Sequence, residues 1–287
     1  MSNKRRRHSH VERSWILGAG VVREVERAYT AGASQDARTG KWLRPFIVET
    51  SSERHLLFSH DSVQSTMRLD DPDALTCEYT RKMMAFLLFN PTPERILMIG
   101  LGGGSLAKFC RRYLPHADIT VVEISADVIS LRDEFYVPID DERFRVVHDE
   151  GSRYLARFDD AVDVILVDAF DHTGVALSLA ASDFYADAAS RLTPNGVLVL
   201  NLSGEPSRYD AHLQRVHEAF GNRTILVPVR AGENDLLFAF NSPHRPDAQE
   251  LQERAQRLQA QLSLAFPRYL RLLLQDVNGN RSEPVFR

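Results

Sequence analysis

The sequence contains little cysteine, and this excludes a fold held together by disulfides. Among 287 residues there are two cysteines, Cys77 and Cys110, and neither has a metal-binding partner at a suitable spacing. A chain with so few thiols has no disulfide framework, and small buried thiols are typical of a reducing compartment. We therefore expect a cytoplasmic protein without a metal centre.

The sequence also lacks long apolar runs and an excess of positive charge. No apolar stretch reaches the roughly 20 residues of a membrane span. The charged start MSNKRRRHSH is not followed by the apolar segment of a secretory signal. The formal net charge is −4 at pH 7, which gives no overall basic surface for nucleic acid. We expect neither a membrane nor a nucleic acid as partner.

The sequence does contain a clear change in the pattern of its apolar residues near residue 95. Beyond this point, almost continuous apolar strands alternate with amphipathic helical segments, which is typical of a parallel sheet covered on both faces. Two late apolar stretches, residues 223–229 and 235–240, are separated by a short turn and predict an antiparallel hairpin. We therefore predict an α/β fold with a mostly parallel, Rossmann-like sheet and a terminal hairpin.

The part before residue 95 has a different pattern. Residues 1–40 are weakly patterned and predict a partly disordered tail. Residues 41–74 contain β-rich pieces broken by Ser, Glu and Asp, which predict a small antiparallel β domain. Residues 75–287 then form the Rossmann-like domain, whose first segment, LTCEYTRKMMAFLLF, has helical spacing.

The stretch MIGLGGGS joins the first parallel strand to a helix. Such a turn lets a ligand approach backbone N–H groups closely, although a tight turn by itself also requires small residues. Acids at the ends of the next three strands favour a ligand site, namely Glu123, then Asp149 and Glu150, then Asp168 and Asp171. Ligands of open α/β sheets bind at the carboxyl ends of the strands, so we expect these acids in one crevice.

The glycine spacing helps to choose between two cofactor classes. A carboxylate about twenty residues after the turn is placed to accept both hydroxyls of a ribose, so a nicotinamide dinucleotide and an S-adenosyl sulfonium are both open. The sixth position counted from Gly100 is Ser105, where the dinucleotide spacing has a glycine. This departure, the terminal hairpin and the acidic crevice favour a sulfonium nucleoside in a fold of the S-adenosylmethionine-dependent methyltransferase type.

These stretches resemble the polyamine aminopropyltransferases, the spermidine and spermine synthases, over residues 46–240. The matching segments are DSVQSTM, EYTRKM, ILMIGLGGG, VVEIS, VVHDEGSRYL, DVILVDAFDHTGVALSLAASDFY and LTPNGVLVLNL. The resemblance implies a small β domain before a methyltransferase-like Rossmann domain. It also implies transfer of an aminopropyl group from decarboxylated S-adenosylmethionine to a small-molecule amine in polyamine biosynthesis, by a homodimer or homotetramer.

The resemblance assigns seven positions to the donor site: Gln64, Gly100, Gly102, Gly103, Glu123, Glu150 and Gly151. Among them, Glu123 would hold the ribose, and Glu150 would take the place of the family's aspartate beside the adenine. Three further positions match catalytic residues. Asp168 would handle the amine nucleophile, Tyr79 would lie at the mouth of the active site, and Asp171 would help to bind the polyamine.

Three positions depart from the family pattern. Gly103 stands where the family has an aspartate for the donor's ammonium group, Thr80 where it commonly has glutamine, and Arg230 where it often has a tyrosine. A lost carboxylate and an added guanidinium both disfavour a cationic substrate. Two alternatives therefore stay open, a methyltransferase that uses intact S-adenosylmethionine and a catalytically silent nucleoside-binding protein. We also expect Gly103→Asp to improve use of the decarboxylated donor if the backbone tolerates the side chain.

Overall fold

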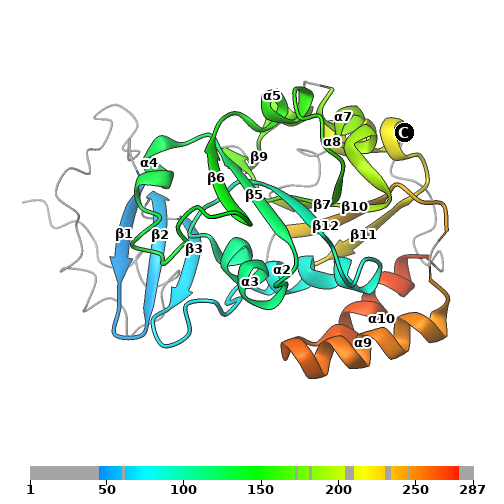
Figure 1. Ribbon diagram of the computed structural model, residues 1–287, viewed down its shortest axis with the longest axis horizontal. Helices are drawn as coiled ribbons and strands as arrows, with labels where there is room; N and C mark the ends of the chain where they lie inside the picture. Colours follow the sequence, from blue (N-terminus) through cyan, green and yellow to red (C-terminus); the bar gives the residue numbers. More distant parts are fainter. Residues whose placement is uncertain are drawn as a thin grey trace, which may run out of the picture.

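The computed structural model describes residues 45–59, 62–171, 174–180, 183–203, 210–229, 234–244 and 246–277. Within these residues the centre is a seven-stranded sheet with the strand order β11-β12-β10-β7-β4-β5-β6 (Figure 1). Its strands are β4 (Arg95–Ile99), β5 (Asp118–Glu123), β6 (Phe144–His148), β7 (Val162–Val167), β10 (Leu192–Ser203), β11 (Thr224–Pro228) and β12 (Asn234–Phe240).

The pairing confirms the predicted parallel sheet and its terminal hairpin. The neighbours β10, β7, β4, β5 and β6 are all parallel. The strands β11 and β12 form the antiparallel hairpin, and β12 also pairs antiparallel with β10. The antiparallel strand is therefore inserted one position inside the edge of the sheet, and β11 forms the edge itself.

Helices cover both faces of the sheet, because successive side chains of a strand point to opposite sides. In β4, Ile96 and Met98 belong to one core, and Leu97 and Ile99 belong to the other. The first core is covered by α2 (Glu78–Met83), η2 (Met84–Leu88), α3 (Ser105–Tyr113), α9 (Ala248–Leu262) and α10 (Phe266–Val277). The second is covered by α5 (Gly151–Ala156), α6 (Leu177–Ala180), α7 (Phe184–Arg191) and α8 (Asp210–Phe220) (Figure 1). In the described part of the chain, no helix is long and apolar enough to cross a membrane.

A small antiparallel β unit precedes this sheet, as the sequence predicts. Its strands are β1 (Phe46–Glu49), β2 (Glu53–Ser59) and β3 (Ser62–Arg68). The side chains of Ile47, Leu56 and Met67 belong to the same hydrophobic core as one face of the large sheet. The proposed tail of residues 1–40 lies outside the described residues, and the boundary between residues 74 and 75 stays a prediction.

The helical segments differ from the sequence prediction in two places. The sequence pattern SADVISLRDEFY predicts a helix over residues 125–136, but α4 covers only Ala126–Ser130. The following residues instead pack beside the glycine turn, where Lys108, buried on α3, donates a hydrogen bond to the carbonyl oxygen of Phe135 at 2.7 Å. In addition, the helix α10, which packs against α9, has no counterpart among the helices predicted from the sequence.

Candidate active site

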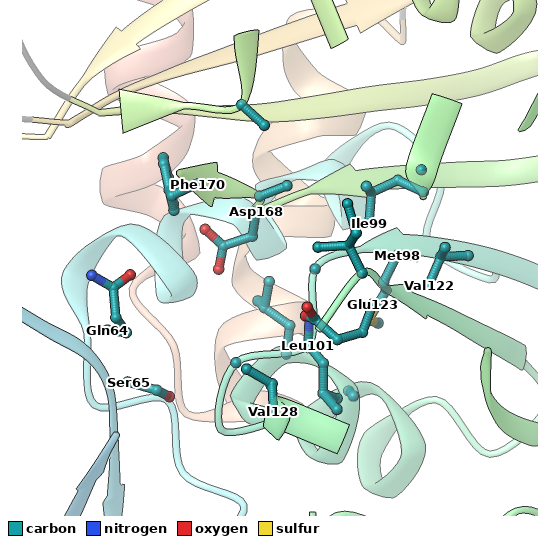
Figure 2. A pocket seen from close by; sticks show the side chains of 18 of the residues that line it. Gln64, Ser65, Met98, Ile99, Leu101, Val122, Glu123, Val128, Asp168 and Phe170 are labelled. Atoms are coloured by element: carbon teal, nitrogen blue, oxygen red, sulfur yellow. The ribbon is translucent and has the colours of Figure 1, made fainter. Parts of the chain in front are cut away.

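A cleft lies at the carboxyl ends of β4, β5 and β7, where open α/β sheets bind ligands. Figure 2 shows Asp168 and Glu123 directed from neighbouring parts of the sheet towards the open space that faces Gln64 of β3. Tyr79 of α2 and the start of α3 complete the lining. The cleft thus has walls from both the β unit and the large sheet.

The first glycine of the turn is required by a close backbone approach. Gly100 has a φ of +98°, and a Cβ atom built there would lie 2.2 Å from the carbonyl oxygen of Asp168. The N–H of Asp168 donates to the carbonyl oxygen of Ile99, and the N–H of Gly100 donates to that of Val122. The turn is therefore fixed between β5 and β7, with Gly100 and Gly102 in the wall of the cleft.

Gly103, where the family pattern has an aspartate, has no room for a side chain unless Ser65 or Phe135 moves. Its φ is not positive, but a Cβ atom would lie 2.7 Å from Ser65 Oγ and 2.9 Å from Cδ1 of the buried Phe135. The hydroxyl of Ser65 in turn lies 3.4 Å from that of Ser105 at the start of α3. Two neutral hydroxyls and an aromatic ring thus occupy the space next to the turn.

Glu123 lies at the end of β5 with its carboxylate held from two sides. Its Oε2 accepts a hydrogen bond of 2.8 Å from the N–H of Leu101, and its Oε1 accepts one of 2.8 Å from the N–H of Ser125. The side chain is buried and lines the cleft. Each oxygen of a carboxylate can accept a second hydrogen bond, so this oriented group suits the predicted contact with two ribose hydroxyls.

Glu150 lines the cleft and also caps helix α5. Its carboxylate accepts hydrogen bonds from the N–H of Ser152 at 3.2 Å, the hydroxyl of Ser152 at 2.5 Å and the N–H of Arg153 at 2.9 Å. Burial acts to raise the pKa of Glu150, but these hydrogen bonds outweigh it and lower the pKa. Beside it, a Cβ atom at Gly151 would lie 2.5 Å from Cγ2 of Ile99, so the helix packs closely on β4.

Asp149 does not join these acids, contrary to the sequence prediction. Its carboxylate is bound by the guanidinium groups of Arg153, at 2.5 Å, and Arg157. Burial acts to raise the pKa of Asp149, but the hydrogen bond from Arg153 and the neighbouring charges lower it overall. Asp149 therefore anchors α5, and the third strand contributes Glu150 alone to the described lining of the cleft.

Asp168 follows β7 and is held by two neutral donors. The hydroxyl of Tyr79 donates to its Oδ2 at 3.2 Å, and the side-chain amide of Asn201 donates to its Oδ1 at 2.8 Å. Burial raises the pKa of Asp168, and the two hydrogen bonds counter part of that rise. Burial and the Asp168 charge raise the pKa of Tyr79 well above its usual value, so this hydroxyl stays protonated near neutral pH.

Sequence reasoning missed Asn201, which belongs to β10 and is fully buried. The only signal in the sequence is an amide within the otherwise apolar run GVLVLNL. Its side-chain oxygen accepts a hydrogen bond of 2.8 Å from the amide of Asn234 on β12.

The remaining predicted residues have mixed outcomes. Gln64 lines the cleft, and its predicted contact with the donor stays a prediction. Thr80 also lines it, and its hydroxyl donates to the carbonyl oxygen of Cys77 at 2.8 Å. The side chain of Asp171 and the whole of Arg230 lie outside the described residues, so their predicted roles remain predictions.

The charge of the cleft has one sign. Among the described residues that line it there are three carboxylates, from Glu123, Glu150 and Asp168, and no lysine, arginine or histidine. The described residues also contain no group of three or more His, Cys, Asp or Glu side chains arranged to hold a metal ion. Three carboxylates without a cationic side chain in the described lining favour a positively charged ligand.

Comparison with known proteins agrees with this geometry. A sequence profile of the spermine/spermidine synthase domain matches residues 76–222. The chain is 36% identical over 231 residues to a polyamine aminopropyltransferase from Chromobacterium violaceum, a match that covers 80% of this chain and 88% of that protein. A relative from Neisseria meningitidis with the same name is 35% identical over 227 residues, or 78% of this chain and 86% of that protein.

Two solved structures share the fold. A probable spermidine synthase from Corynebacterium glutamicum has a TM-score of 0.63 at 21% identity, over 80% of this chain and 88% of that one. Human methyltransferase-like protein 13, solved in complex with SAH, has a TM-score of 0.57 at 26% identity, over 65% of this chain and 93% of that one. Since the profile spans half of the sequence and the bacterial relatives match over most of their length, the chain belongs to the spermine/spermidine synthase family.

Proposed function

We propose that this protein transfers the aminopropyl group of decarboxylated S-adenosylmethionine to a small-molecule amine. Membership of the family and the identity to polyamine aminopropyltransferases support the reaction class. The observation that carries the choice of substrates is the cleft itself, which has three carboxylates and no cationic side chain among its described residues.

The donor's nucleoside part fits the glycine-turn side of the cleft. Glu123 would accept the two ribose hydroxyls, since its carboxylate is already oriented by the N–H groups of Leu101 and Ser125. Glu150 and Gly151 would lie beside the adenine. Support for an adenosyl ligand comes from methyltransferase-like protein 13, which shares the fold and was solved with SAH.

The charge of the cleft favours the decarboxylated donor over the intact one. The decarboxylated donor carries a sulfonium and an ammonium group, whereas the intact donor adds a carboxylate. A carboxylate removed from water needs a cationic partner or several hydrogen bonds, and the described lining offers no cationic side chain. The family's usual ammonium ligand is missing at Gly103, beside which the hydroxyls of Ser65 and Ser105 lie. These two groups and the Gln64 amide of the lining are candidates to bind that end of the donor.

The chemistry is a direct displacement at carbon. The acceptor's neutral amine attacks the aminopropyl carbon bound to the sulfonium. A C–N bond forms, the C–S bond breaks, and its electron pair stays on sulfur as the neutral thioether of methylthioadenosine. The amine loses a proton, for which Asp168 is the positioned acceptor beside Tyr79. Alignment of the two substrates supplies much of the acceleration in such a reaction.

A methyltransferase reaction with intact S-adenosylmethionine is the second candidate. The observation that favours it is the missing carboxylate at Gly103, which removes a negative charge from the end of the donor pocket. By family analogy we further propose a homodimer or homotetramer in the cytoplasm, which accords with the free thiols of Cys77 and Cys110. Light scattering after size exclusion would give the number of subunits.

One product assay separates the two reactions. The protein would be incubated with either donor and a panel of linear diamines and polyamines, and the nucleoside product identified by mass spectrometry. Methylthioadenosine and an acceptor extended by one aminopropyl group are expected from the decarboxylated donor alone. S-adenosylhomocysteine from the intact donor would replace our proposal by the methyltransferase, and no turnover with either donor would leave only nucleoside binding.

A further inference from the structure

Asn201 has a polar side chain in the apolar interior of the protein, where burying an amide is energetically unfavourable. It is fully buried in β10, whose neighbouring residues Val199, Leu200 and Leu202 are all apolar and buried. A buried amide without hydrogen-bond partners costs about 1–3 kcal/mol. The position therefore calls for a function of the amide that an apolar residue could not provide.

The hydrogen bonds of Asn201 define which way its amide points. Its Oδ1 accepts from Asn234, so its Nδ2 donates to Asp168, and each of the two distances is 2.8 Å. Asn234 stands opposite Ser203 in the antiparallel pairing of β10 with β12, and Asn201 stands opposite Leu236. The two asparagines are thus diagonal neighbours on one face of the sheet. The hairpin strand β12 thereby reaches the Asp168 carboxylate through Asn201.

This arrangement makes the two oxygens of Asp168 unequal. Oδ1 lies at 2.8 Å from the Asn201 amide, whereas Oδ2 has the longer contact of 3.2 Å with the Tyr79 hydroxyl. We propose that Asn201, itself held by Asn234, is a positioning residue that occupies Oδ1 and leaves Oδ2 as the oxygen that takes the proton of the amine. This inference rests on the proposed function of Asp168 as the proton acceptor.

The titratable groups around Asp168 support a test by pH. In the described structure, Tyr79 and Cys77 face it, both from the start of α2, and Asp168 contributes to a raised pKa of each. Both are therefore neutral near pH 7. Burial raises the pKa of Asp168, and the hydrogen bond from Asn201 is the larger of the two effects that lower it. Removal of that amide should raise the pKa of Asp168 further.

The test compares Asn201→Leu, Asn234→Ala and a matched control, Asn241→Leu. Asn241 is at the other end of the same strand pair, where its amide donates to the carbonyl oxygens of Leu192 and Thr193, far along β10 from Asp168. Turnover of the decarboxylated donor would be measured from pH 5 to 9, together with calorimetric affinity for methylthioadenosine.

For Asn201→Leu we expect at least a tenfold loss of kcat, an acidic limb of the kcat profile displaced to higher pH, and an affinity for methylthioadenosine within twofold of the parent. Asn234→Ala should show the same changes to a smaller extent, because the Asn201 amide can then rotate. Asn241→Leu should keep the parental pH profile. A parental kcat and pH limb in Asn201→Leu, or the same losses in Asn241→Leu, would overturn the positioning role.

A second measurement works even if the protein transfers no aminopropyl group. The carboxyl carbon of Asp168 would be assigned by ¹³C NMR through its absence in Asp168→Asn, and titrated in the parent and in Asn201→Asp. A second carboxylate beside Oδ1 should raise the apparent pKa of the pair, and an unchanged titration would contradict the contact. An inactive parent with this shift present would reject the proposed function and leave the contact intact.

Discussion

Glu123 shows how one carboxylate can serve both the fold and a ligand. Both of its oxygens accept backbone N–H groups, from Leu101 and Ser125. In Glu123→Gln one oxygen becomes an NH₂ group that would face a backbone N–H, and the charge offered to the ribose is lost. We expect methylthioadenosine affinity to fall by roughly 1–3 kcal/mol, measured by calorimetry. The exposed Glu142 offers a matched control in Glu142→Gln, and equal affinity of parent and Glu123→Gln would remove Glu123 from the donor site.

At Asp168 a substitution can remove the charge of the side chain and keep its hydrogen bond with Asn201. In Asp168→Asn the new side-chain oxygen can still accept from Asn201, so the local packing should survive. The charge that holds and deprotonates the amine disappears, and loss of a positioned base typically reduces turnover by about 10²–10⁴-fold. We expect this fall in kcat with a nearly unchanged affinity for methylthioadenosine. Turnover close to the parent's would exclude Asp168 from the mechanism, and a large loss of nucleoside affinity would make it a donor ligand instead.

At the scale of elements, the glycine turn and the segment after α4 form one packed unit. Because the Cβ of residue 103 would meet Ser65 Oγ and the Phe135 ring, Gly103→Asp should overpack this unit. We expect a loss of about 1–3 kcal/mol in the free energy of unfolding, measured by urea denaturation, with no gain in use of the decarboxylated donor.

The double variant Gly103→Asp with Phe135→Leu tests the cause. If Phe135 is the obstacle, the double variant should recover stability relative to Gly103→Asp and then show a lower KM for the decarboxylated donor. Phe135→Leu alone is the control for the loss of the ring. A Gly103→Asp protein as stable as the parent would show that the turn tolerates the aspartate.

Sequence could predict the elements whose signals are local. The glycine turn, Glu123 and Asp168 follow from their places at the ends of apolar strands. The segment after α4 is held by the bond from Lys108 to Phe135, 27 positions along the chain, which no helical periodicity reveals. Asn201 is likewise recognisable as a site residue only once β10 and β7 lie side by side. The features that the sequence does not predict are therefore contacts between residues that lie far apart along the chain.

At the scale of the whole molecule, the β unit and the sheet share a core, although the sequence pattern separates them at residue 74. Leu56 is fully buried in the core of the large sheet, whereas its neighbour Leu57 belongs to a separate cluster with Phe46 and Val48. We expect Leu56→Ala to destabilise the entire molecule by about 2–5 kcal/mol in one cooperative transition.

The matched control is Leu57→Ala, which removes the same side chain from the smaller cluster. Fluorescence and circular dichroism followed in the same denaturation would show whether the transitions coincide. A separate early transition in Leu56→Ala, with the sheet unaffected, would mean that the β unit unfolds as an independent domain.

Lys108 gives the molecule an unusual response to alkali. Burial lowers the pKa of this lysine from 10.5 to about 8. Between these two values the unfolded chain binds a proton that the folded chain has released, so the contribution of Lys108 to the free energy of unfolding should rise with pH, by up to about 1.4 kcal/mol per pH unit. Below pH 8 the lysine is charged in both states, and above pH 10.5 it is neutral in both, so its contribution is then constant. Urea denaturation from pH 7 to 9 should show this rise in the parent and a smaller one in Lys108→Met, and parallel curves would refute it. The range stops at pH 9 because burial raises the pKa of Cys110 to about 12 and the pKa of Tyr79 above its usual value, and both groups oppose the rise at higher pH. A fold that buries this amine beside its ligand-binding turn is therefore more stable in mildly alkaline than in neutral surroundings, because the cost of burying the charge is relieved there.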